Sequence, residues 1–435
     1  MSTSPKPKPR VFYGWYIVAT CFFIGFFSVG ARNAFGIFVI PMSEEFGWNR
    51  SVISFAGALG VLVNGLSQPF LGNAYDRLGG RKLILSGVLI IGITLVLLSF
   101  TFHFAYFVLI LGIIMAVAMS AGSITTGAVL VSKWFEKKRA TAISISSAGV
   151  SVGGLILVPF ATYLVILIGW RLTWVALGSL IVFLVLPMAY FLLRDDPADL
   201  GLYPDGEKKT EGSKLRENSG LSRGPLVVDD DWRKAFRSFP MWQLCISYFV
   251  CGFTTLIMSI HFVPYAVERG FSPQTAATAF GVLSMMNTIG VLIVGPLCDK
   301  FGNKNLLGFL YGFRGIGYVL LLLLPGQWGL WAFAVITGAS WVATVPPTTA
   351  LTADVYGLKK VGTLSGIAFM AHQIGGSIGI QFGGIARDLT GSYTSPFAVA
   401  VVLLIIASVT SFSIQEKRFS SKYQLERLNL ATGKG

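Results

Sequence analysis

Two arginines and one histidine interrupt apolar stretches that are long enough to cross a membrane in this 435-residue chain. Arg32 and Arg314 fall inside such stretches, and His372 lies within the run from Met370 to Gly376. A charge at the bilayer centre costs roughly 2.5–3.5 kcal/mol on insertion scales, so these residues usually mark a function. All 20 acidic residues map to loops or helix ends. We therefore expect an anionic substrate to supply the missing negative charge.

Each of these residues also has a structural explanation. Arg32 could extend outward to the membrane surface, and Arg314 could bond backbone carbonyls. His372, with its neighbour Gln373, could titrate near neutral pH and bind an anion or relay a proton, or it could bond a neighbouring helix. His261 is the weaker of the two histidine candidates. Further polar residues could line a path or bond between helices, namely Asn64, Gln68, Thr125, Thr126, Asn287 and Thr344.

Metal and nucleophile chemistry find little support in the chain. The four cysteines show no CxxC or His-linked spacing, and we expect them to be packing residues. The run Gly375–Gly379 fits the G-x-S-x-G pattern, but that elbow requires a strand–turn–helix context, and this run lies in an apolar helix. We expect no cofactor, no metal and no enzymatic activity.

Composition indicates which elements must position these residues. The chain is 54% hydrophobic and 12% charged, whereas soluble domains are about 25% charged. This excludes soluble enzyme classes and predicts an all-α membrane protein of twelve transmembrane helices in two six-helix halves. The expected helices span about 13–41, 51–74, 83–101, 105–132, 140–168, 172–193, 240–263, 275–298, 305–324, 329–352, 362–386 and 395–414.

Basic residues predict the orientation of these helices. If the N-terminus is cytoplasmic, inside segments hold 28 of the 34 Lys and Arg residues, and the positive-inside rule then places both termini in the cytoplasm. This distribution also explains the net charge of +14 without nucleic acid as a partner. We divide the chain into an N-terminal half at 1–193, a cytoplasmic linker at 194–238, a C-terminal half at 239–414 and a cytoplasmic tail at 415–435.

The two halves repeat in sequence. The run Gly72-x-x-x-Asp76-Arg77-x-Gly79-Gly80-Arg81-Lys82 ends the second expected helix, and Gly295-x-x-x-Asp299-Lys300-x-Gly302-Asn303-Lys304 ends the eighth. The offset that carries Asp76 onto Asp299 also carries Glu136-Lys137 onto Lys359-Lys360 and Gly153 onto Gly376. Two related halves with a site between them are the layout that a rocking carrier needs.

The loop after the second helix resembles the signature of the major facilitator superfamily, G-x-x-x-D-R-x-G-R-R, for which this two-half layout is already known. Gly72, Asp76, Arg77, Gly79 and Arg81 match, with Gly80 inserted before the basic pair. Gly72 permits close helix approach, and Asp76 could pair with a base on a neighbouring helix. We predict a latch that closes the inner side, formed by Gly72, Asp76, Arg77, Arg81 and Asp299. The alternative is that the bases merely anchor topology.

Other motifs resemble the monocarboxylate-carrier and oxalate–formate-antiporter branches of this superfamily. They are Tyr13-Gly14-Trp15, Glu45-Phe46-Gly47-Trp48-Asn49-Arg50, Trp134-Phe135-x-Lys137-Lys138-Arg139-Ala140 and Asp196-Pro197-x-Asp199-Leu200-Gly201-Leu202-x-Pro204-Asp205-Gly206. The resemblance implies a small organic anion, often moved with a proton. Monocarboxylate carriers usually hold Arg and Asp in the eighth helix where this chain has Val291 and Asn287, so the resemblance implies the branch and leaves the substrate open.

The resemblance also implies places for the charged residues, because the first helix borders the cavity in this fold and the ninth is peripheral. We therefore expect a substrate site at Arg32, Asn33, His372 and Gln373, with Arg314 and His261 as further candidates. The sequence predicts a secondary active carrier of a small organic anion, monomeric, in the bacterial inner membrane among its lipids. The alternatives are an exporter of amphipathic compounds or drugs, and a non-transporting membrane sensor.

Overall fold

The computed structural model describes residues 11–48, 50–206 and 231–415, and within them every regular element is a helix. The N-terminal half contains α1 (Gly14–Asn33), α2 (Phe35–Phe46), α3 (Arg50–Leu78), α4 (Gly80–Leu98), α5 (Phe104–Phe107), the π-helix η1 (Val108–Met115), α6 (Ala116–Ala121), α7 (Ile124–Trp134), α8 (Arg139–Leu180), the π-helix η2 (Ile181–Val185) and α9 (Leu186–Leu192). The C-terminal half contains α11 (Phe239–Glu268), α12 (Pro273–Phe301), α13 (Asn303–Leu323), α14 (Gly326–Ser340), α15 (Val345–Tyr356), α16 (Val361–Thr390) and α17 (Thr394–Phe412).

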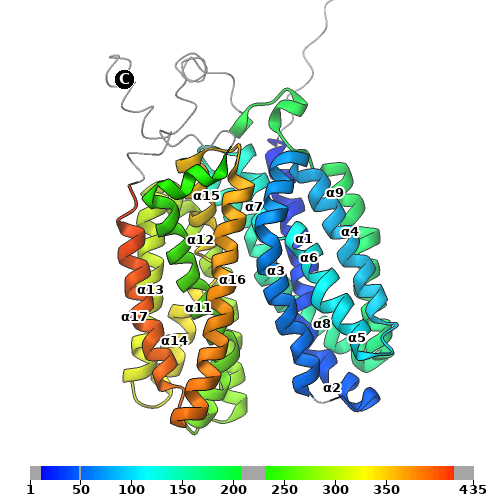
Figure 1. Cartoon of the computed structure of the whole chain (residues 1–435), viewed down its shortest axis with the longest axis vertical. Helices are drawn as coiled ribbons and strands as arrows, with labels where there is room; N and C mark the ends of the chain where they lie inside the picture. The colour runs from blue at the N-terminus through cyan, green and yellow to red at the C-terminus, as the bar shows by residue number, and fades with distance from the viewer. Residues whose placement is uncertain (1–10, 49, 207–230, 416–435) are drawn as a thin grey trace, which may run out of the picture.

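Short 3-10 helices lie between the halves, on either side of residues 207–230. They are η3 (Pro197–Leu200) and η4 (Pro204–Gly206) after α9, and η5 (Trp232–Arg237) before α11. Figure 1 shows the two helical halves side by side, with the start of α1 and the end of α17 at the same end of the bundle.

Length and hydropathy explain the twelve crossings. Ten helical stretches in the described chain are long and apolar enough to span a membrane. One of them, Arg139–Leu192, contains two crossings, because Gly169 has the non-helical angles φ 77 and ψ 167 inside α8. The remaining crossing is α16, whose 30 residues reach about 45 Å at 1.5 Å per residue. The predicted all-α membrane fold of two six-helix halves is confirmed.

One buried apolar cluster is built mainly from α1 to α9 and extends into the other half through residues such as Val294 and Cys298 of α12, and a second cluster is built mainly from α11 to α17. Large apolar side chains also point outward, including Phe70, Ile166, Phe183 and Leu389, which are 76–81% exposed. A water-facing surface rarely carries so broad an apolar cover. The outer belt is therefore suited to lipid.

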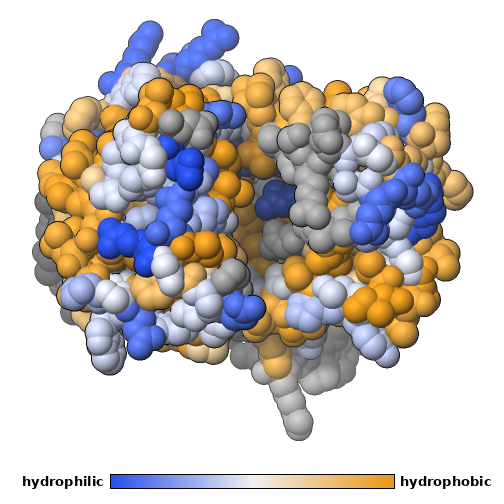
Figure 2. Space-filling model, turned by 90° about the horizontal axis from the view of Figure 1, so that it is seen from below, coloured by the Kyte–Doolittle hydropathy of each residue, from blue (hydrophilic) through white to orange (hydrophobic). Residues whose placement is uncertain are grey.

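The halves meet where α3 packs on α16 and α8 packs on α12. Glycines allow these close approaches: a Cβ added to Gly72 would lie 3.0 Å from Cα of Thr363, and one added to Gly295 would lie 2.7 Å from Cα of Thr141. We call the end of the bundle at which α1 starts and α17 ends the tail face, and the other end the open face. Figure 2 views the open face and shows a hollow between the halves, with hydrophilic atoms inside it.

The structure corrects the repeat register for the later helices of each half. Lys138 and Lys360 both immediately precede their helices, since α8 begins at Arg139 and α16 at Val361. The segment from Asp299 to the start of α16 is one residue shorter than the segment from Asp76 to the start of α8. The sequence offset that relates α8 to α16 is therefore one position smaller than the offset that relates Asp76 to Asp299. The predicted match of Glu136-Lys137 to Lys359-Lys360 is wrong by one position, as is that of Gly153 to Gly376.

Candidate functional site

Arg32 lies in the last turn of α1, where a basic side chain is favoured by the helix dipole. Its side chain is exposed, and no hydrogen bond or ion pair reaches it from the described residues. It lies two turns after Gly25 and one turn after Ser28, which places all three on one face of the helix. Gly25 lines an internal pocket with Val150 of α8, and Ser28 is fully buried. Arg32 therefore points to the protein interior and not to lipid.

Asn33, which the sequence predicts beside Arg32 in the substrate site, is less informative. Asn33 is the last residue of α1, and Ala34 then caps the helix by donating its N–H to the carbonyl of Gly30. The side chain of Asn33 is outside the described part of the structure.

His372 lies on α16 in the middle of the bundle and is half-buried. Its ring stacks on Phe369 at a centroid distance of 5.4 Å and contacts Tyr248 of α11 at 5.0 Å. Its Nδ1 lies 3.1 Å from Oε1 of Gln373, and its Nε2 lies 3.5 Å from Oγ1 of Thr255. Two acceptors thus face the two ring nitrogens, because the hydroxyl hydrogen of Thr255 is donated to the carbonyl of Cys251.

Gln373 connects the two halves at the same depth. Its Nε2 donates to Oδ1 of Asn64 on α3 at 3.3 Å, and Asn64 in turn donates to Ser120 at 2.7 Å. We call the Asn64–Gln373 contact the first polar bridge. It is buried on both sides, since Asn64 is 5% exposed and Gln373 7%.

A second polar bridge repeats the first across the other interface between the halves. Asn287 of α12, which the repeat aligns with Asn64, donates to Ser151 of α8 at 2.8 Å and accepts from the N–H of Val342 at 2.9 Å. Ser151 corresponds to Gln373 when α8 is aligned with α16 from their first residues. The repeat detected at the helix ends therefore continues into the middle of the membrane, where polar pairs close both interfaces.

Arg314 lies within the C-terminal half and is 1% exposed. It donates to the carbonyls of Ser340 and Trp341 at the end of α14, and to Cys251 and Thr254 of α11 at 3.4 and 3.3 Å. This is the carbonyl-bonding alternative considered from the sequence. The chain is non-helical between α14 and α15, and Arg314 satisfies carbonyls that this break leaves free.

His261 also bonds within its own half, where its Nε2 lies 3.0 Å from the carbonyl of Ile380. The remaining polar residues proposed for the path are all buried. Thr344 contacts Cys251 Sγ at 3.2 Å and Thr126 donates to the carbonyl of Ala121 at 2.8 Å. Gln68 Nε2 and Thr125 Oγ1 are buried without a hydrogen-bond partner in the described chain.

The predicted latch residues Asp76 and Asp299 bridge the halves at the tail face. Asp76 accepts from the N–H groups of Gly362 and Thr363 at 3.0 and 2.8 Å, and from Oγ1 of Thr363 at 2.6 Å. The partner is thus the N-terminus of α16, where the sequence suggested a base. A helix N-terminus serves as well, because its first N–H groups are unpaired and its dipole favours a carboxylate.

Asp299 makes the same set of contacts in the opposite sense. It accepts from the N–H groups of Ala140 and Thr141 at 3.0 and 2.9 Å, and from Oγ1 of Thr141 at 2.5 Å. These residues open α8 of the N-terminal half, so each half caps a helix of the other.

The remaining latch residues divide by role. Gly72 packs directly on the backbone of Gly362 and Thr363. Arg77 is exposed. Arg81 forms hydrogen bonds inside its own half: its backbone N–H donates to Oδ1 of Asp195 at 2.7 Å, and its guanidinium group donates to the carbonyl of Tyr190 at 2.7 Å.

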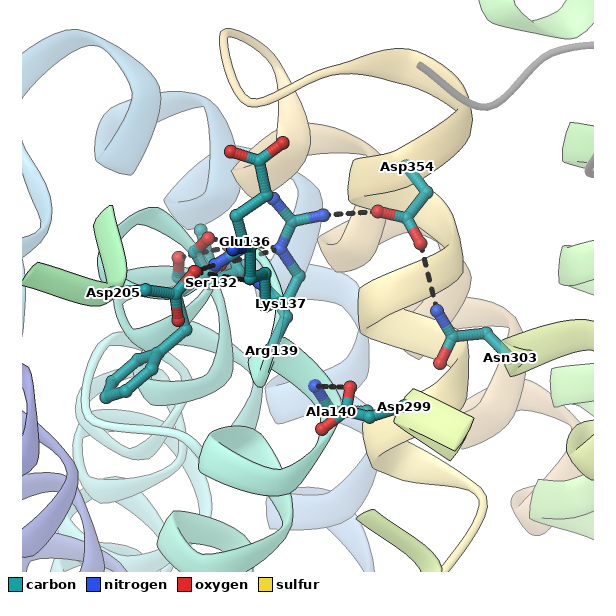
Figure 3. A network of polar contacts seen from close by, with 11 residues as sticks. Ser132, Glu136, Lys137, Arg139, Ala140, Asp205, Asp299, Asn303 and Asp354 are labelled. Carbon is teal, nitrogen blue, oxygen red and sulfur yellow. Dashed lines mark hydrogen bonds and ion pairs between the residues drawn. The ribbon is translucent and has the colours of Figure 1, made fainter. Parts of the chain in front are cut away.

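One ion pair of the tail face was missed in the sequence. Arg139 at the start of α8 pairs with Asp354 of α15, which also accepts from Asn303 at 2.9 Å (Figure 3). Both side chains are nearly buried, at 13% and 10% exposed. Since 215 positions separate the two residues, no local spacing in the sequence points to their contact.

The geometry is that of a molecule closed at one end and hollow at the other. Two carboxylate caps and one ion pair hold the halves together at the tail face, polar bridges lie at mid-depth, and a cation on α1 without a partner among the described residues remains accessible in the interior.

Comparison with known proteins agrees with this geometry. The family model described as Major Facilitator Superfamily matches residues 21–380. The uncharacterized MFS-type transporter YcxA of Bacillus subtilis is 26% identical over 416 residues, covering 94% of this chain and 95% of that protein. Monocarboxylate transporter 12-B of Danio rerio is 24% identical, covering 95% and 89%, and monocarboxylate transporter 11 of Homo sapiens is 24% identical, covering 94% and 84%.

Solved structures show the same fold at low sequence identity. The proton:xylose symporter XylE superposes with a TM-score of 0.73 at 14% identity, covering 96% of this chain and 99% of that chain. The Escherichia coli fucose:proton symporter FucP superposes with a TM-score of 0.67 at 16% identity, covering 92% and 98%.

Proposed function

Because the chain belongs to the major facilitator superfamily, which makes it a multi-pass membrane transporter and not an enzyme, we propose that it is a secondary active carrier of a small organic anion. The proposed substrate class is the monocarboxylates, since transporters of that name are similar over more than nine tenths of this chain. We place the carrier, as a monomer, in the bacterial inner membrane. Both termini then face the cytoplasm, as the distribution of 34 basic residues favours.

The observation that carries this proposal is the state of Arg32. Of the two arginines inside membrane-spanning stretches, Arg314 has hydrogen-bond partners around its guanidinium group, whereas Arg32 has none among the described residues and is accessible. An unpaired intramembrane charge is expensive to keep without a use. A guanidinium group presents parallel N–H donors that match a carboxylate, so Arg32 is the proposed anion subsite, with Asn33 beside it.

We assign the accompanying proton to His372. A neutral imidazole carries one N–H and can serve only one of the acceptors Gln373 Oε1 and Thr255 Oγ1, whereas an imidazolium serves both. Gln373 also forms the first polar bridge to Asn64. Protonation of His372 therefore acts on the same amide that joins the halves, which would connect proton binding to their relative movement.

Alternating access completes the proposal. The contacts at Asp76, Asp299 and Arg139 hold the tail face shut while the open face is hollow (Figure 2). Release to the tail side would require these contacts to break and the halves to rock about the site, as in carriers built from two related halves.

The proposal is tested by ligand binding to the purified protein. A panel of monocarboxylates, with dicarboxylates, neutral sugars and amphipathic cations as comparisons, is screened for a shift of the thermal unfolding midpoint, because a ligand that binds the folded state raises it. We expect at least one monocarboxylate to stabilise the protein and to be taken up by proteoliposomes when a proton gradient is imposed. Stabilisation by amphipathic cations, with no response to any organic anion, would overturn the assignment of substrate class.

A further inference from the structure

A short segment between the last helix of the N-terminal half and residue 207 lies against the machinery of the tail face. We call residues 196–206 the strap and residues 135–138, between α7 and α8, the gate turn. Oδ2 of Asp205 in the strap accepts from the N–H groups of Glu136 and Lys137 in the gate turn, at 2.9 and 2.8 Å. Figure 3 shows this contact beside the cross-half ion pair.

The gate turn leads directly into the residues that close the tail face. Arg139 follows it and pairs with Asp354 of the other half, and the N–H groups of Ala140 and Thr141 bind Asp299. Arg139 itself depends on the local chain path, because its Nε donates to the carbonyls of Ser132 and Phe135 at 3.2 and 3.1 Å. A shift of the gate turn would thus move both cross-half contacts together.

The conformation of Asp205 supports a directed role. It has φ 59, and among the described residues it is the one non-glycine with a positive φ. A positive φ is uncommon for a residue with a Cβ, although Asp and Asn adopt it more readily than most, and here the two hydrogen bonds to the gate turn accompany it. Gly206 packs on Phe12, whose ring contacts Trp134 and Phe135 at centroid distances of 6.1 and 5.5 Å, so the strap is fixed against the gate turn from two sides.

We propose that Asp205 is a positioning residue for the tail-face closure: its carboxylate holds the gate turn so that Arg139 and the N-terminus of α8 meet Asp354 and Asp299. Loss of the carboxylate leaves these partners in place but poorly aligned. The carrier then shifts toward the state that is open at the tail face. This inference rests on the proposed alternating access, and it gives the start of the linker a task in that cycle.

Two substitutions at position 205 separate the carboxylate from the backbone strain. Asp205→Gly removes the acceptor and relieves the positive φ, since glycine adopts it freely. Asp205→Asn keeps an acceptor oxygen and tolerates the conformation but removes the charge. Asp199→Asn is the matched control, because Asp199 is an exposed acid of the same strap that caps the N–H of Asp196 and not the gate turn.

Closure is read from a cysteine placed between the halves. In a background with the four native cysteines replaced, Ser144→Cys puts a thiol on α8 at a position that is 0% exposed and bonded to Val291 of α12. Its labelling rate with a membrane-permeant maleimide reports how often the halves part. We expect Asp205→Gly to raise this rate about threefold or more, because the gate turn is no longer preorganised. Asp205→Asn should give a smaller rise, and Asp199→Asn should give none.

A double variant distinguishes positioning from a general structural role. If Asp205 acts through the gate, Asp205→Gly should raise the labelling rate of Asp354→Asn by a smaller factor than it raises that of the protein with Asp354, because the Arg139–Asp354 part of its effect is already lost and effects through a shared contact are not additive. An unchanged rate in Asp205→Gly, or full additivity with Asp354→Asn, would overturn the inference. The labelling needs no substrate, so a wrong assignment of the transported anion would leave these results unchanged, and a failure here would leave the binding screen intact.

Discussion

Asp76 and Asp299 occupy equivalent positions in the two repeated halves, and each caps the first turn of a helix in the opposite half, Asp76 on α16 and Asp299 on α8. Each carboxylate takes two backbone N–H groups and one threonine hydroxyl. The two caps form one reciprocal closure, in which the repeat of the sequence becomes a repeat of contacts across the interface.

The first prediction concerns this closure. Asp76→Asn and Asp299→Asn should each insert normally and slow transport, because an amide loses the charge-assisted bonds that a carboxylate makes to a helix N-terminus. Such bonds contribute about 1.5–3 kcal/mol, so the balance between closed and open states should shift roughly tenfold or more. Transport and Ser144→Cys labelling measure the two effects.

Asp195→Asn is the matched control for these variants. Asp195 also accepts from a backbone N–H near a helix start, that of Arg81 at 2.7 Å, but it does so within its own half. The Asp195→Asn variant should leave the labelling rate of Ser144→Cys unchanged. Normal transport by a well-expressed Asp76→Asn protein would count against the latch.

The second prediction separates the two intramembrane arginines by stability. Arg314→Gln should lower the unfolding midpoint strongly, because buried groups that lose their partner cost about 1–3 kcal/mol each and Arg314 serves Ser340, Trp341 and Thr254. Arg314→Lys should rescue little, since an ammonium group cannot reproduce the fork of donors. Arg32→Gln should leave the midpoint equal or higher. The reverse ranking in thermal unfolding would show that the roles of the two residues are exchanged.

The third prediction concerns the open face of the N-terminal half. Glu45 accepts from Arg171 at 2.6 Å and from Trp170 at 2.7 Å, and these bonds hold the pKa of Glu45 below its ordinary value of 4.5. A depressed pKa adds stability that is present above pH 4.5 and is lost as the pH falls through the folded-state value. The contribution is modest because the pair is exposed, on the order of 0.2–1 kcal/mol.

Thermal unfolding at neutral pH and at about pH 3 tests this prediction. Glu45→Gln should lower the midpoint at neutral pH and have a smaller effect in acid. The neighbouring Glu44→Gln, at an exposed position outside the contact between Glu45 and Arg171, is the control and should have little effect at either pH. An equal effect of Glu45→Gln at both pH values would contradict the linkage.

Much of the fold could be predicted because its causes are local. Low charge and long apolar runs determine membrane helices, and basic loops indicate their orientation. The repeated Gly-x-x-x-Asp runs identified Asp76 and Asp299 through residue types at fixed spacing. Their partners could not be predicted, because backbone N–H groups at a helix start carry no residue signature, whereas an acidic side chain by itself indicates a basic partner.

The same limit explains what was missed elsewhere. Arg139 was visible as one more cytoplasmic base, but its ion pair with Asp354 depends on how two distant helix ends meet. Asp205 belonged to a motif noted for resemblance alone, and its contact with Glu136 and Lys137 is again to backbone. The sequence alone does not decide the role of Arg314, because only packing determines whether free backbone carbonyls lie within reach of its guanidinium group.

The central claim is that Arg32 binds the carboxylate of the transported anion. It is tested most directly by the dissociation constant of a monocarboxylate found in the binding screen, measured for wild type, Arg32→Lys and Arg32→Gln. Loss of a charge-assisted hydrogen bond weakens affinity roughly ten- to hundredfold. We predict that loss for Arg32→Gln and a partial loss for Arg32→Lys, with folding unchanged in both. An Arg32→Gln protein that binds the same monocarboxylate with wild-type affinity would contradict the account.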